Sequence, residues 1–133
     1  MKQIYLSHCS KDKSAQAKAT GEKLTPDRLY TDPDLVRFMS RCTEAGLKWA
    51  ILSDRYGLFR AQDRHEYYEK PPDTVTEDEE RQIAEDLREG LSRFDTVWFY
   101  VRKASFHPFY ERVLQKSGLI QKVNFFSDLD QIQ

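Results

Sequence analysis

The chain has 133 residues, of which 39% are hydrophobic and 32% charged, and its formal net charge is −1. Such a length and composition predict one globular domain over residues 1–133. A nearly neutral charge excludes a general attraction to nucleic acid or anionic membranes, so anion binding must depend on local groups of cations.

Cysteine content and hydropathy bear on the cellular compartment. The chain has two cysteines, Cys9 and Cys42, and so few are typical of a reducing compartment, although the sequence leaves a disulfide between them open. No apolar run approaches the ~20 residues of a membrane span. The N-terminus lacks the apolar core of a secretory signal. We therefore expect a cytoplasmic protein without a membrane partner.

The first half of the chain predicts a strand, a helix and a second strand. Residues 2–7 alternate weakly in hydropathy and predict a strand, after which a long polar loop follows. Asp32 as the cap and Pro33 at the first helical position predict a helix that ends at Gly46. Residues 48–53 contain an apolar run, typical of a strand buried on both faces. Two strands joined by a helix predict a parallel pair.

The second half adds two further strands. Residues 60–70 are charged and aromatic and predict an irregular lobe. A capping box at Thr76 predicts a helix to about Arg93, and residues 96–101 have the strongest β-propensity in the chain. A helix from Pro108, a last strand over 121–126 and a short terminal helix complete the predicted elements. We expect an α/β fold, with a three-layer open sheet of about four mostly parallel strands and helices on both faces.

Polar side chains follow the ends of three predicted strands. Because parallel strands have their carboxyl ends at one edge of a sheet, these residues are expected to share that edge. They are Ser10, Lys11 and Lys13 after the first strand, Ser53, Arg55, Tyr56 and Gly57 after the second, and Arg102 and Lys103 after the third.

Cations with small hydroxyl groups suit an oxyanion such as phosphate. We expect Lys11, Lys13 and Arg55 to hold the phosphate, while Ser10 and Ser53 donate hydroxyl groups and Tyr56 stacks on the ligand. The alternative is that these cations are ordinary solvated loop residues.

Three residues are candidate catalytic groups. Cys9 lies between His8 and Ser10 with lysines nearby, which predicts a lowered thiol pKa and a nucleophilic thiolate. The alternative for Cys9 is a small buried residue at a strand end. Asp63 and Glu66 suit acid–base chemistry if the lobe folds over the sheet edge, and otherwise are surface charges.

Several site classes have no motif in this sequence. There is no glycine-rich phosphate loop, no Cys/His set with zinc spacing and no Gly-x-Ser-x-Gly nucleophile elbow. No cofactor and no metal site are predicted.

Three segments carry a resemblance to known families. The turn Cys9-Ser10-Lys11-x-Lys13, the segment Leu29-Tyr30-Thr31 and the run from Trp49 to Leu58, in this order, resemble an uncharacterised family of small microbial and phage domains. The Leu-Ser-x-x-Tyr-Gly-Leu core is also similar to the peroxide-stress protein YaaA. More loosely, it is similar to a domain that accompanies archaeosine-type tRNA modification and has a fold akin to uracil-DNA glycosylase. The resemblance covers roughly the first half of the chain and implies an α/β fold with a link to nucleic acid or nucleobases.

The leading functional prediction is binding of an anionic nucleotide-like or nucleic-acid ligand at the carboxyl ends of the strands, within nucleic-acid modification or a stress response. One alternative is an enzyme that cleaves or exchanges an N-glycosidic bond, with Cys9, Asp63 or Glu66 as catalytic groups. The other is a protein-interaction module that uses exposed aromatic residues.

Overall fold

The computed structural model describes residues 2–102 and 106–132, so Lys103 lies outside the described residues. The described part forms a mixed five-stranded sheet in the order β3-β2-β1-β4-β5. Strands β1, β2, β4 and β5 run parallel, and β3 pairs antiparallel with β2. The strands are β1 (Gln3–His8), β2 (Trp49–Ser53), β3 (Gly57–Arg60), β4 (Thr96–Tyr100) and β5 (Val123–Phe126).

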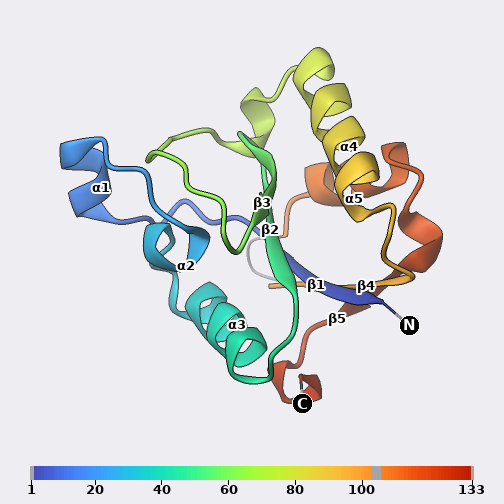
Figure 1. Cartoon of the computed structure of the whole chain (residues 1–133). Helices are drawn as coiled ribbons and strands as arrows, with labels where there is room; N and C mark the ends of the chain where they lie inside the picture. Colours follow the sequence, from blue (N-terminus) through green and yellow to red (C-terminus); the bar gives the residue numbers. More distant parts are fainter. Residues whose placement is uncertain (1, 103–105, 133) are drawn as a thin grey trace.

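Helices cover both faces of the sheet (Figure 1). Helix α3 packs on one face, where Phe38 stacks on Tyr100 of β4, and α4 and α5 lie on the other. The predicted α/β open sheet is therefore confirmed, with β3 as an additional strand. The helices are α1 (Ala15–Thr20), α2 (Pro26–Leu29), α3 (Pro33–Glu44), α4 (Glu77–Leu91) and α5 (Pro108–Lys116), with single 3₁₀ turns at η1 (Pro72–Thr74), η3 (Ile120–Lys122) and η4 (Leu129–Gln131).

The three long helices begin where the sequence predicts. The Asp32 carboxylate accepts the N–H of Leu35 at the start of α3, and Gly46, with φ of 70°, follows the end of that helix. Thr76 and Glu79 form both bonds of the capping box of α4. Each of these helices buries one apolar stripe against the sheet.

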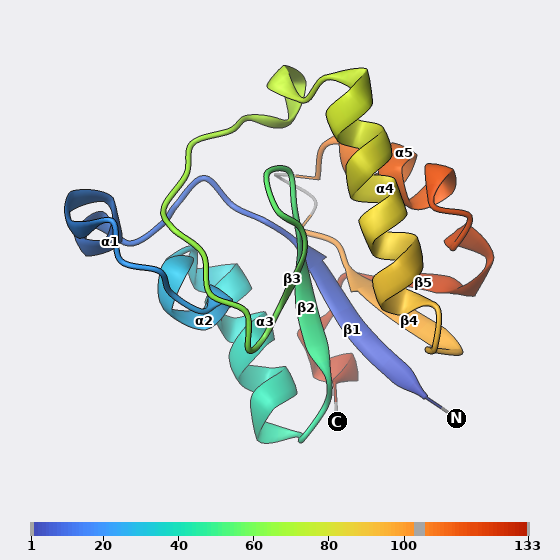
Figure 2. The same cartoon turned by 45° about the horizontal axis from the view of Figure 1, so that its top comes forward.

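The polar segment after β1 is not the long loop that the sequence predicts. It contains α1 and α2, and its two ends meet where Ser14 N–H donates to the Leu29 carbonyl at 2.8 Å. Leu24 forms an isolated β-bridge with His65, which ties this excursion to the segment after β3 (Figure 2). Helices of six and four residues leave too short a pattern for helical periodicity to register.

Strand β3 returns from β2 through a tight turn. Ser53 pairs with Gly57, whose φ of 72° lies in the left-handed region that suits glycine. Since β3 runs opposite to its neighbour, Arg60 at its end lies beside Ala50, toward the edge where β2 begins.

Both cysteines are buried and free, so the disulfide that the sequence leaves open is not formed. None of the helices formed by the described residues has the length and apolar composition that a bilayer crossing requires.

Candidate ligand site at the carboxyl ends of the strands

A cleft of about 620 Å³ lies where the loop after β1 and the turn after β2 meet the N-termini of α3 and α5. Its volume is within the range of about 300–1,000 Å³ that is typical of small-molecule sites. The residues that line it are Cys9, Ser10, Lys11, Asp12, Lys13, Asp32, Asp54, Glu69, Lys70, Pro71, Pro72 and Tyr110.

The loop after β1 brings two lysines to the cleft. The Ser10 hydroxyl accepts the Asp12 N–H at 3.2 Å, which turns the loop back toward the sheet. Lys11 is exposed, whereas Lys13 is half-buried, with its Nζ 4.3 Å from the centre of the Tyr68 ring. Burial lowers the pKa of Lys13. Neither lysine forms an ion pair with a carboxylate in the described part of the chain.

The floor of the cleft contains a thiol and a phenol. The Cys9 Sγ lies 3.4 Å from the Tyr110 hydroxyl oxygen. Burial, followed by the neighbouring charge of Asp54, raises the pKa of the Cys9 thiol to about 11. The expectation of a lowered pKa is therefore wrong, because burial and the charge of Asp54 outweigh the hydrogen bonds that lower it. The thiol is neutral at pH 7 and is not an activated nucleophile.

Asp54 is the carboxyl group next to this thiol. Its side chain is 3% exposed, and its Oδ1 has no hydrogen-bond partner among the described residues. Burial raises the pKa of Asp54 to about 6, although a hydrogen bond with the Cys9 thiol and the charge of Lys13 act in the opposite direction. The sequence contains a signal for this residue, since a carboxylate lies two positions after a fully apolar run, but Asp54 is not among the candidates predicted above.

The Ser53 hydroxyl is used inside the protein rather than at the cleft surface. It donates to the Tyr68 hydroxyl at 3.1 Å and accepts the N–H groups of Arg55 and Tyr56 at 3.1 and 3.0 Å. The Tyr68 hydroxyl in turn lies 2.6 Å from that of Tyr30. Ser53 is fully buried, so it shapes the turn that holds Asp54 and does not line the cleft.

Arg55, Tyr56 and Gly57 line a separate hollow of about 290 Å³ beside α4. Asp54 is the residue that lines both this hollow and the cleft. The Tyr56 ring stacks on His65, with ring centres 3.9 Å apart, so one face of the ring is occupied. The structure thus brings Ser10, Lys11 and Lys13 together and puts the second predicted group in an adjacent hollow.

Arg102 is buried beneath the cleft. Its guanidinium group donates to the Asp32 carboxylate at 3.1 Å, to the Cys9 carbonyl at 2.9 Å and to the His8 carbonyl. These bonds fasten the end of β1 to the start of α3, and Arg102 does not line the cleft. Burial and the charge of Arg102 lower the pKa of His8 to about 3, so this imidazole is neutral at pH 7.

The segment after β3 contributes residues other than those predicted. Asp63 accepts the backbone N–H of Arg60 at 2.9 Å, and the Glu66 carbonyl accepts the Tyr56 hydroxyl at 3.0 Å; neither residue lines the cleft. Glu69 and Lys70 from the same segment do line it. Glu69 pairs with Lys18 at 3.3 Å and Lys70 with Glu79 at 3.2 Å.

Comparisons with known proteins find no match to a family model, to a curated protein or to a solved structure. The family resemblances described above therefore stay predictions. In the residues described, no group of three or more His, Cys, Asp or Glu side chains is placed to hold a metal ion.

Proposed function

We propose that this protein binds a small anionic, nucleotide-like ligand in the cleft at the carboxyl ends of β1 and β2. The observation that carries the proposal is the pair of lysines, Lys11 and Lys13, which line a cleft of about 620 Å³ without a carboxylate partner among the described residues. Two ammonium groups on one short loop suit a phosphate group. The cleft volume suits a ligand of nucleotide size.

Two of the carboxylates that line the cleft are paired with cations and therefore oppose an anionic ligand less. Glu69 is paired with Lys18 and Asp32 with Arg102, so both carboxylates are compensated. Asp54, with a pKa of about 6, is mostly ionised at pH 7 and becomes neutral as the pH falls below 6. The negative charges that act on Lys13 are, in decreasing order, those of Asp54, Glu69 and Asp12.

Each polar group of the cleft has a role in the proposed binding mode. Lys11 and Lys13 hold the phosphate, and the Ser10 hydroxyl, which accepts the Asp12 N–H, donates its own proton to a phosphate oxygen. The planar part of the ligand lies toward the floor, where Tyr110 and Asp54 provide polar groups for its edge.

Calorimetric titration with purine and pyrimidine nucleoside mono- and diphosphates at low salt tests this proposal. We expect the double variant Lys11→Ala with Lys13→Ala to bind about tenfold more weakly, or worse, because both phosphate contacts are lost. The matched control is Lys2→Ala with Lys23→Ala, which removes the same charge from exposed positions outside the cleft. Equal affinities of the two double variants, or no nucleotide binding at low salt, contradict the proposal.

Single-stranded RNA and DNA oligonucleotides form a second arm of the titration. A nucleic-acid ligand predicts affinity that rises with oligonucleotide length and falls steeply with salt. A nucleotide-sized ligand predicts that a mononucleotide binds about as tightly as an oligonucleotide.

A second candidate function is cleavage or exchange of an N-glycosidic bond, and the environment of Asp54 favours it. A carboxyl group with a pKa of about 6 suits general acid–base catalysis near neutral pH. Release of free base from nucleosides and nucleotides measures this activity. Its loss in Asp54→Asn with retained nucleotide binding supports the enzyme, whereas the absence of base release from every substrate leaves binding as the function.

A further inference from the structure

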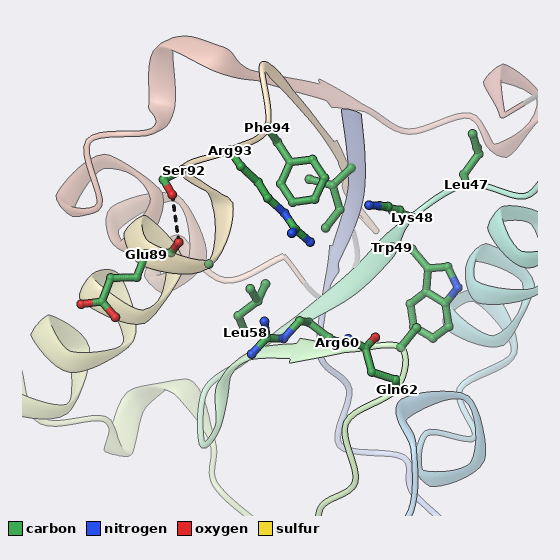
Figure 3. A pocket seen from close by; sticks show the side chains of 13 residues that line it. Leu47, Lys48, Trp49, Leu58, Arg60, Gln62, Glu89, Ser92, Arg93 and Phe94 are labelled. Atoms are coloured by element: carbon green, nitrogen blue, oxygen red, sulfur yellow. Dashed lines mark hydrogen bonds between the residues drawn. The ribbon is translucent and has the colours of Figure 1, made fainter. Parts of the chain in front are cut away.

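A second hollow, of about 430 Å³, lies at the opposite edge of the sheet, where the parallel strands begin (Figure 3). It shares no lining residue with the cleft described above. Three cations line it: Lys48 directly before β2, Arg60 at the end of β3 and Arg93 between α4 and β4.

The sheet topology explains why these cations meet. Strands β2 and β4 both run parallel to β1, so the segments that enter them, with Lys48 and Arg93, arrive at the same edge. Strand β3 runs in the opposite direction and therefore ends at that edge, which brings Arg60 to it.

Phe94 is the aromatic residue between two of these cations. The Lys48 Nζ lies 5.7 Å from the centre of the Phe94 ring, and the Arg93 guanidinium carbon lies 5.2 Å from it. The ring is 5% exposed and, with Leu58, gives the hollow an apolar wall. Figure 3 shows the ends of the Lys48 and Arg93 side chains near this ring.

The hollow has an excess of positive charge. Neither Lys48 nor Arg93 forms an ion pair with a carboxylate of the described residues, and Arg60 pairs with Asp63 through an exposed contact of 3.3 Å. Glu89 is the one carboxylate in the lining, and Figure 3 shows it pointing away from the cations.

We propose that this hollow binds a small molecule that carries an oxyanion, a phosphate or a carboxylate, on a flat apolar body. Guanidinium groups bind both oxyanions through paired N–H donors, and the ammonium group of Lys48 adds a point charge. The apolar body packs against Phe94 and Leu58. This site is independent of the function proposed for the cleft.

Tryptophan fluorescence tests the inference directly, because Trp49 lines the hollow and the other indole, Trp98, does not. In a Trp98→Phe background, Trp49 is the sole indole of the chain. Phenyl phosphate and benzoate are the probes, and inorganic phosphate is the control that lacks an apolar body. We expect a saturable change with at least one aromatic probe and about tenfold weaker binding of inorganic phosphate.

Variants made in the Trp98→Phe background test which residues bind the aromatic probe. We expect Arg93→Ala and Lys48→Ala each to weaken binding of the aromatic probe about tenfold, and Arg93→Lys to lie between Arg93→Ala and the parent because it keeps the charge without the paired donors. The Lys11→Ala with Lys13→Ala variant should bind the probe as tightly as the parent. Tighter binding of phenyl phosphate than of benzoate identifies a phosphate ligand, and the reverse order identifies a carboxylate.

Three outcomes overturn the proposal: no saturable change with either aromatic probe, unchanged affinity in Arg93→Ala, or inorganic phosphate binding as tightly as phenyl phosphate. Far-UV circular dichroism of each variant checks that the fold is retained. Arg93 is exposed, so its replacement leaves the core intact.

Discussion

Asp54 couples the stability of the protein to pH. Its pKa rises from 3.8 to about 6 because burial disfavours the charged form, so the folded protein holds this proton more tightly than the unfolded chain. The resulting stabilisation is complete below about pH 4 and is lost as the pH rises through about 6. At pH 7 the folded protein carries a buried, ionised carboxylate at a cost of about 3 kcal/mol.

Replacing Asp54 by Asn removes this dependence. We expect the free energy of unfolding of Asp54→Asn, minus that of the parent, to increase by about 2 kcal/mol between pH 4 and pH 7. Denaturant titrations at pH 4, 5.5 and 7 measure the difference. His8, whose lowered pKa acts in the opposite direction, is present in both proteins and cancels from it. A difference that does not change with pH contradicts the raised pKa of Asp54.

Individual side chains show how far the sequence predicts the candidate site. Lys11 and Lys13 reach the cleft as expected, since they follow a buried strand at its carboxyl end. Ser53 lies at a strand end and Arg102 follows one, yet both form their hydrogen bonds inside the protein, Ser53 within its own turn and with Tyr68, and Arg102 with Asp32, 70 positions earlier. The partner of Cys9 is Tyr110, which lies 101 positions later, and no local pattern predicts that contact.

Among the helices and strands, the length of an element determines whether the sequence predicts it. Helices α3, α4 and α5 each combine a capping signal with an apolar stripe, and these two independent patterns agree. Strand β3 has four residues and pairs with β2 only, so its short apolar run cannot be distinguished from a loop before the pairing is known.

In the turn between β2 and β3, we expect substitution of Gly57 to destabilise the protein. A Cβ there would lie 2.6 Å from the Asp86 carboxylate oxygen that accepts the Leu58 N–H at 2.8 Å. Gly57→Ala therefore combines left-handed strain of about 1 kcal/mol with loss of a hydrogen bond worth about 1 kcal/mol. We expect about 2 kcal/mol of destabilisation in denaturant titrations.

Gly46→Ala is the matched control for this prediction. Gly46 has nearly the same φ, 70° against 72°, but a Cβ at this position meets nothing within 4 Å. We therefore expect Gly46→Ala to destabilise the protein by only the strain of about 1 kcal/mol. Equal losses in both variants would show that the contact with Asp86 contributes nothing.

In the whole molecule, cations gather at both edges of a sheet in which β3 alone of the described strands is antiparallel. The carboxyl edge receives Lys11 and Lys13 from the loop after β1, whereas the opposite edge receives Arg60 because β3 runs backwards. The sequence predicts the first grouping from parallel strands alone. It does not predict that Arg60 joins Lys48 and Arg93 at the opposite edge, because that requires the direction of β3.

The two buried thiols report on different parts of this architecture. Cys42, 0% exposed, lies on the face of α3 that packs against the sheet, whereas Cys9, 6% exposed, lines the cleft. Exposure of Cys42 requires separation of a whole layer, and exposure of Cys9 requires only movement of the loop after β1. We therefore expect Cys42 to be labelled by a bulky disulfide reagent only through global unfolding, and Cys9 through a local opening.

Labelling rates against denaturant concentration, measured on Cys9→Ser and Cys42→Ala so that each thiol is observed alone, test this difference. The Cys42 rate should rise with denaturant as steeply as global unfolding does, while the Cys9 rate should be faster in water and rise less steeply. A nucleotide that occupies the cleft should slow labelling of Cys9 directly. It should slow labelling of Cys42 only as much as it stabilises the whole protein against unfolding. Identical denaturant dependence of the two thiols would mean that the loop after β1 opens only when the whole sheet does.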